Sequence, residues 1–181
     1  MKRFLLALIF AGGLAGRAAA QGGLPGPYQF ELKFGPAIGI IDEGGSQFHL
    51  GMHFGINMTP NLPHHIYIDL PLAFNFGNFH TDIMLIPGIE ADIALPTPVP
   101  LYIYPMFGLG LGFLVPSCPA AFNCATDTAF AIRMGAGIKY ILDGRWNFFF
   151  EPFNLDFFPA GSNQGGTPGH YTLNFGAGVN F

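Results

Sequence analysis

The stretch HYTLNFGAGVNF, residues 170–181, alternates between apolar side chains and polar or absent ones. The apolar positions are Tyr171, Leu173, Phe175, Ala177, Val179 and Phe181, and the positions between them are His170, Thr172, Asn174, Gly176, Gly178 and Asn180. Successive side chains of a β-strand point to opposite faces. The period of two therefore predicts a strand that is apolar on one side and polar or bare on the other.

Seven earlier segments repeat this alternation. They are residues 28–40, 47–58, 65–76, 82–95, 101–115, 130–142 and 146–157. Connections rich in Gly, Pro, Asn and Asp separate most of them. Segment 146–157 changes parity at Pro152, where a β-bulge would restore the alternation and tolerate the proline. Each segment is long enough for the ~9–11 residues of a tilted transmembrane strand.

Charge is sorted between the two faces of these segments. The apolar positions carry no charged residue, and all the charges lie at the opposite parity: Glu31, Lys33, Asp69, Asp82, Glu90, Asp92, Arg133, Lys139, Glu151 and Asp156. A soluble barrel would turn its charges to water, yet only 10% of this chain is charged against a usual ~25%. An eight-stranded barrel has an interior only wide enough for side chains to fill, so the bulky apolar residues must face outward. We therefore predict an all-β fold, an eight-stranded antiparallel up-and-down transmembrane β-barrel, rather than a soluble sandwich or barrel.

The amino terminus has the pattern of an export signal. Lys2 and Arg3 precede an apolar run at 4–14, and small residues follow at 18–20. The run is too short for the ~20 residues of a membrane-spanning helix. The expected organisation is a cleaved signal peptide (1–20), a periplasmic segment (21–27) and the barrel (28–181). Cleavage leaves four bases against eleven acids, a formal net charge of −7, which argues against a nucleic-acid partner.

The connections predict how the barrel is oriented. Outer-membrane barrels have short periplasmic turns and longer external loops. With a periplasmic amino terminus, the turns near Asn61, Pro98 and Gly144 are periplasmic, and the connection with Cys118 and Cys124 is external. Two thiols without further His or Cys ligands do not make a zinc site. We expect these two cysteines of an exported chain to form a disulfide.

The signal peptide, the eight segments and the terminal Phe181 together resemble the small outer-membrane β-barrel families, such as the OmpA transmembrane domain, OmpX and OmpW. The resemblance covers 28–181 in architecture and pattern, and no family site residues carry over. It implies a location in the outer membrane of a Gram-negative bacterium, in contact with lipid and lipopolysaccharide, and we expect a monomer. It also implies that the barrel-assembly machinery reads the last strand through Tyr171, Phe175 and Phe181.

The polar faces of the predicted strands meet in the barrel lumen. Eight charged residues are expected there: Glu31, Lys33, Asp69, Glu90, Asp92, Arg133, Lys139 and Glu151. Buried charges must be paired or hydrated, so three bases facing an acid excess predict a network that plugs the lumen. The competing hypothesis is a narrow cation-lined conduit, in which Gly108, Gly110 and Gly112 leave room for water.

The sequence predicts no metal site, cofactor or catalytic group. His49 and His53 share a face but stand ~13 Å apart along a strand, too far to share a metal ion by themselves. The adjacent pair at 64–65 points to opposite sides. The serines after the signal peptide are the loop residues Ser46, Ser117 and Ser162. Since none has a His within two residues, we predict that the protein is not an enzyme.

The resulting hypothesis is an integral outer-membrane barrel with a structural or surface-interaction role and a plugged lumen. The first alternative is a narrow channel or transporter for small or hydrophobic solutes, which requires a continuous apolar cavity behind the glycine row. The second alternative is an outer-membrane lipid-modifying enzyme. The facing assignment further predicts that Phe175→Arg destabilises the barrel more than Thr172→Arg.

Overall fold

The computed structural model describes residues 24–40, 46–78, 80–117, 126–160 and 169–181. The expected signal peptide and the expected Cys118–Cys124 disulfide lie outside the described residues. In the described part of the chain, no helix is long and apolar enough to cross a membrane.

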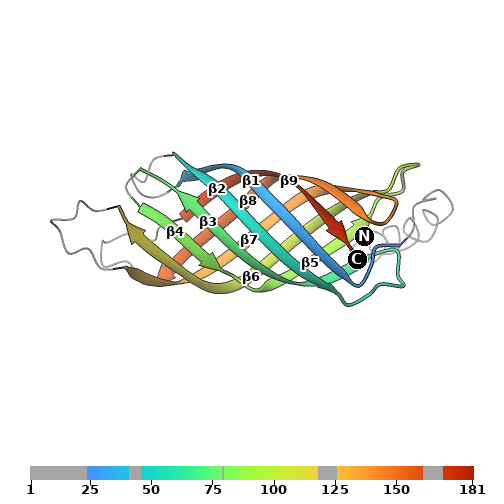
Figure 1. Ribbon diagram of the computed structural model, residues 1–181, viewed down its shortest axis with the longest axis horizontal. Coiled ribbons are helices and arrows are strands. Elements are labelled where there is room, and N and C mark those ends of the chain that lie inside the picture. The colour runs from blue at the N-terminus through green and yellow to red at the C-terminus, as the bar shows by residue number, and fades with distance from the viewer. Residues whose placement is uncertain (1–23, 41–45, 79, 118–125, 161–168) are drawn as a thin grey trace, which may run out of the picture.

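The described chain forms a closed antiparallel β-barrel, drawn in Figure 1 with its strands steeply tilted. The strands are β1 (Tyr28–Gly39), β2 (Ser46–Asn57), β3 (His65–Phe76), β4 (His80–Leu85), β5 (Gly88–Ala94), β6 (Leu101–Pro116), β7 (Asp127–Leu142), β8 (Trp146–Ala160) and β9 (Gly169–Asn180). Strands that follow one another in the chain pair with each other, except that β4 and β5 each pair with both β3 and β6, and β9 pairs with β1 to close the ring. Because β4 and β5 together occupy one strand position between β3 and β6, the barrel has eight strand positions around its circumference, as predicted.

The fourth strand position is interrupted, which was not predicted from the sequence. A single strand was expected over 82–95, but β4 and β5 are separated by Ile86 and Pro87. Pro87 has no N–H to donate to the ladder, and Pro71 lies opposite this gap in β3. The wall therefore loses regular hydrogen bonding at this level, although the pairing register is the same on both sides of the gap.

A close approach of two backbones accompanies the interruption. Across from it, in β6, lies Gly110, where a Cβ atom would be only 2.0 Å from the carbonyl oxygen of Leu85. The missing side chain lets the two backbones approach each other, and Ile86, at the same inward parity as Asp82 and Met84, is buried with 1% of its surface exposed. The glycine is thus required by packing at this point.

Two local features of the sequence have the predicted form. The β8–β9 register shifts between Glu151 and Asn154, so that a β-bulge lies at Pro152 and restores the alternation. Between β7 and β8, Asp143 and Gly144 both have positive φ, 53° and 68°, and Arg145 N–H donates to the Leu142 carbonyl at 3.0 Å. Positive φ at both central residues is the hairpin-turn geometry that an Asp-Gly pair favours.

The two faces of the wall are inverted relative to a soluble protein. Among the described residues, 23 polar or charged residues are buried against 13 apolar ones, so the polar groups line the inside. Every strand exposes large apolar side chains on the outside, for example Phe30, Phe48, Ile66, Leu85, Ile89, Phe107, Phe130, Phe148 and Phe175. A closed barrel leaves no backbone edge unpaired, and an apolar exterior suits hydrocarbon. The structure is therefore that of a membrane-spanning barrel.

Candidate functional site in the barrel lumen

Lys139 lies at the centre of the buried charges. Its Nζ atom is 2.9 Å from Glu31 Oε1 and 3.2 Å from Asp92 Oδ2, and it also donates a hydrogen bond to Glu90. All four side chains are fully buried. They come from β7, β1 and β5, and neither β1 nor β5 is a neighbour of β7 in the sheet. The contacts therefore cross the lumen instead of following the wall.

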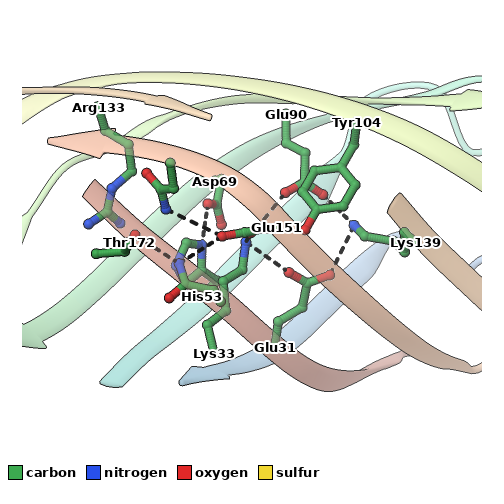
Figure 2. Close-up of polar contacts among 12 residues, drawn as sticks. Glu31, Lys33, His53, Asp69, Glu90, Tyr104, Arg133, Lys139, Glu151 and Thr172 are labelled. Atoms are coloured by element: carbon green, nitrogen blue, oxygen red, sulfur yellow. Dashed lines mark hydrogen bonds and ion pairs between the residues drawn. The ribbon is translucent and has the colours of Figure 1, made fainter. Parts of the chain in front are cut away.

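Lys33 extends this group of charges. It donates to Glu151, and its Nζ atom lies 3.5 Å from Glu31 Oε2 and 3.8 Å from Glu90 Oε2. Figure 2 shows the side chains of Glu31, Glu90 and Glu151 converging on the two lysines from different strands. We call the six residues the central cluster: Glu31, Lys33, Glu90, Asp92, Lys139 and Glu151.

Aromatic side chains pack against the central cluster. Tyr104 donates a hydrogen bond of 2.9 Å to Glu151 Oε1, and its ring centroid is 4.8 Å from the Nζ atom of Lys139. The ring of Phe149 lies 5.0 Å from the Nζ atom of Lys33 and meets Tyr104 edge-on. Cations over ring faces are attracted by the ring quadrupole. The aromatic groups thus fill the lumen and contribute to holding both lysines.

Two further charge pairs lie beside the central cluster. Arg133 forms a bidentate pair with Asp156, with Nε 2.6 Å from Oδ1 and Nη2 3.0 Å from Oδ2. Asp69 is bonded to His53 Nδ1 at 2.7 Å. A cavity of about 10 Å³ lies between Asp69, Arg133 and Met106. This is roughly the space that a single water molecule needs.

The glycine row of β6 does not border an open cavity. A Cβ atom on Gly108 would lie 2.9 Å from the Ile86 carbonyl oxygen, and one on Gly112 would lie 2.4 Å from the Phe158 ring. Ile86 and Phe158 belong to an apolar cluster that fills this level of the lumen together with Ala73, Met84, Ala129 and Ala131. Gly108 borders the cavity of about 10 Å³, so the row leaves room for about one water molecule, while neighbouring backbone and side chains occupy the rest of the space.

The structure divides the predicted lumen residues into two groups. Six of the eight form the central cluster, whereas Asp69 and Arg133 pair elsewhere. Sequence analysis left Asp156 out of the predicted network, although it has the same strand parity as Glu151 once the bulge is counted. It also missed the uncharged partners Gln29, Tyr104, Phe149 and Asn174. Their parity was available in the sequence, but their contacts depend on which strands face each other across the lumen.

The lumen histidines are closer together than strand spacing implied. His49 Nδ1 bonds to Asn75 Oδ1 at 2.6 Å, and a Cβ atom on Gly51 would lie 3.2 Å from His49 Nε2 and 3.3 Å from His53 Nε2. The backbones of the two histidines remain ~13 Å apart along the strand. Their Nε2 atoms are much closer than that because both rings lean over Gly51. Neither Nε2 atom has a hydrogen-bond partner within the described residues.

A third group of polar side chains lies toward the end of the barrel at which β6 ends and β9 begins. His80, Asp82 and His170 each offer a possible ligand atom, and these atoms lie within 4.8 Å of one another. His80 contacts Gln47 and Asp82, while Asp127 accepts from the Thr128 N–H. Of the loop serines, Ser162 lies outside the described residues.

Known structures share this architecture. The sequence matches no protein-family model and no curated protein. Neisserial surface protein A has a TM-score of 0.64 and 13% identity, over 86% of this chain and 97% of that one. Ail, the attachment invasion locus protein of Yersinia pestis, has a TM-score of 0.55 and 10% identity, over 87% and 100%. The outer membrane enzyme PagL has a TM-score of 0.51 and 15% identity, over 81% and 97%.

The fold is that of the small outer-membrane β-barrels. At these identities the likeness shows the fold alone, and the three proteins include a surface protein, an attachment protein and an enzyme. Fold therefore does not select the function. The closed barrel with its apolar exterior makes this chain a membrane-spanning β-barrel with the fold that these outer-membrane proteins share.

Proposed function

We propose that this protein is a structural barrel of the outer membrane, with a closed lumen and a surface-presenting role. The observation that carries this proposal is the central cluster, whose ion pairs join strands on different sides of the lumen. The side chains are fully buried and packed with Tyr104 and Phe149. Ion pairs that cross the lumen in this way block the path of solutes.

The transport alternative has less support in the structure. It requires a continuous apolar passage behind Gly108, Gly110 and Gly112, but Ile86 and Phe158 occupy that space. The cavity next to Arg133 holds about one water molecule. A filled lumen favours the structural role over a conduit for small or hydrophobic solutes.

Single-channel recording in planar lipid bilayers tests the closed lumen. The purified, folded protein is expected to give no steady conductance. The double variant Lys33→Ala/Glu151→Ala removes one cation and one anion, so the net charge is unchanged while the packing is opened. We expect measurable openings from this variant, with circular dichroism showing that its β-structure is retained. Steady, sizeable conductance from the wild type would contradict the proposal of a closed lumen.

The surface role is supported by where the long connections leave the barrel. The connections between β6 and β7 and between β8 and β9 are longer than the turns at the opposite end. An epitope inserted between residues 163 and 164 should be labelled by antibody on intact cells. The same epitope inserted after Asn61 should be labelled only after permeabilisation. The reverse pattern would mean that the orientation is inverted and would remove the basis for a surface role.

A further inference from the structure

Three side chains with metal-ligating atoms converge across the outer part of the lumen. His80 and Asp82 come from β4, and His170 comes from the start of β9. In the closed ring, β4 and β9 are four strands apart in either direction, so they lie on opposite sides of the barrel. The group therefore spans the lumen and is not an arrangement of neighbours along one strand.

The spacing of the three groups suits a metal ion better than direct hydrogen bonds. The Nε2 atoms of His80 and His170 are each 3.5 Å from an oxygen of Asp82. That separation is long for an N–H···O hydrogen bond, which is usually 2.7–3.2 Å. Zinc binds His nitrogen and carboxylate oxygen at about 2.0–2.2 Å, which places neighbouring ligands of a tetrahedral site roughly 3.4 Å apart.

Asp82 supplies a second, independent observation. Its side chain is fully buried, and neither carboxylate oxygen has a hydrogen-bond partner within the described residues. The surroundings are partly apolar, since Met84 belongs to the apolar lumen cluster and the Phe158 ring lies 5.7 Å from the His170 ring. The nearby Arg133 is committed to Asp156. The two imidazoles, each at 3.5 Å, are too distant to satisfy the carboxylate with normal hydrogen bonds. Burying it in this state is costly, and a cation between the imidazoles would reduce that cost.

An amide side chain lies close to each imidazole, behind the ring at His170 and beside the metal-facing nitrogen at His80. Asn75 lies 3.4 Å from Nδ1 of His170, the ring nitrogen turned away from Asp82. Gln47 contacts His80 Nε2 through its amide nitrogen at 2.8 Å, while its Oε1 has no partner in the described part of the chain. Because Nε2 is also the His80 atom that faces Asp82, an ion bound there would displace the Gln47 amide nitrogen, and rotation of the amide would turn Oε1 toward the ion. Groups that orient metal-bound imidazoles are a regular part of such sites.

We propose that His80, Asp82 and His170 bind one divalent transition-metal ion, with zinc as the reference cation, and so tie β4 to β9 across the outer end of the lumen. Two imidazoles and one carboxylate favour such ions over magnesium or calcium, which prefer all-oxygen sites. His80 is 23% exposed, which gives an entry path at this end. The proposal does not depend on the lumen being closed to solutes.

Metal titration of the folded, full-length barrel in detergent micelles tests the site. All proteins would carry Cys118→Ser and Cys124→Ser so that the thiols cannot contribute. Zinc is titrated in competition with a chromogenic chelator, and cobalt binding is followed by visible absorption. We expect one equivalent per chain and the absorption bands of a site with nitrogen and oxygen ligands.

Three variants assign the ligands. Asp82→Asn and His170→Gln should each weaken zinc binding at least tenfold. His64→Gln is the matched control, because His64 lies at the opposite end and bonds to the Ala94 N–H, and it should leave the affinity unchanged. Absence of stoichiometric binding by the parent protein overturns the proposal. So does binding that both ligand variants leave intact, and circular dichroism of each variant ensures that a loss is not one of folding.

Discussion

At the scale of single residues, Lys139 shows how the lumen depends on charge balance. It is the common partner of Glu31, Glu90 and Asp92, and all of these side chains are removed from water. Removing one member of a buried ion pair leaves the others uncompensated, which costs more than the pair contributed. Lys139→Met keeps most of the volume and removes the charge, so we expect a loss of about 3–5 kcal/mol in the free energy of unfolding. Urea titration of the barrel in lipid vesicles measures it.

The controls for Lys139 separate charge from general damage. Arg145→Met removes a cation whose side chain is exposed next to Trp146, and it should cost no more than about 1 kcal/mol. Adding Glu90→Gln to Lys139→Met should recover part of the loss, because one uncompensated carboxylate is removed. A loss from Lys139→Met as small as that from Arg145→Met would show that the central cluster is hydrated and not a packed plug.

At the scale of elements, the interruption between β4 and β5 makes β6 sensitive to substitution at one position. Gly110→Ala would place a methyl group 2.0 Å from the Leu85 carbonyl oxygen, which is backbone and cannot move aside cheaply. We expect a destabilisation of at least about 1–3 kcal/mol by the same urea titration. Gly169→Ala is the matched control, since its nearest neighbour would be at 3.3 Å, and it should lose clearly less. Equal tolerance of both changes would mean that the backbone at Leu85 and Ile86 does not approach Gly110 as closely as described.

The last strand tests the lipid-facing assignment. Phe175 is 45% exposed on the outside and stacks on Phe150 at 4.9 Å between ring centroids. Phe175→Arg should cost about 2–4 kcal/mol near the bilayer midplane, whereas Phe175→Leu should cost much less. Folding titrations into lipid vesicles compare the two, and similar losses would argue against a lipid-facing Phe175.

The structure changes the companion prediction for the opposite face of β9. From the sequence, Thr172→Arg was expected to be milder than Phe175→Arg because Thr172 has the opposite parity. Thr172 is in fact fully buried beside Asn174, with its Oγ1 atom accepting from Nδ2 at 3.2 Å. An arginine would overfill this space. Thr172→Ser is therefore the appropriate mild substitution on the lumen face.

Strand parity explains why much of this fold could be predicted from the sequence. Side chains alternate across a strand, so the outward position of Phe175 and the inward position of Glu151 both follow from counting residues once the bulge at Pro152 is recognised. The break at Ile86 and Pro87 does not follow from parity, and counting residues does not reveal that Gly110 lies opposite it in β6.

Contacts across the lumen were beyond the reach of the sequence for a related reason. Parity places His80, Asp82 and His170 on inward or rim positions, but their meeting depends on the stagger and tilt of the closed ring. The same holds for Tyr104 and Glu151, which are bonded although their strands are not neighbours. A single sequence shows which face of the sheet each residue occupies. It does not show which residues on opposite sides of the barrel lie at the same level along its axis.

At the scale of the whole molecule, the two faces of the barrel are inverted relative to a soluble protein: apolar residues face lipid and polar residues fill the lumen. The chain contains a single tryptophan, Trp146, so fluorescence can report on one chosen position at a time. In a Trp146→Phe background, Phe107→Trp places the probe at a position that is 50% exposed on the outside. Phe149→Trp places it in the lumen, where the native side chain is 5% exposed.

Quenching of these two variants by brominated lipid is the most direct test of the inversion. Both proteins are folded into vesicles of increasing bromolipid content, and circular dichroism shows that each retains its β-structure. We predict strong quenching of the Phe107→Trp variant and little quenching of the Phe149→Trp variant. Equal quenching of the two, or stronger quenching of the Phe149→Trp variant, would contradict it.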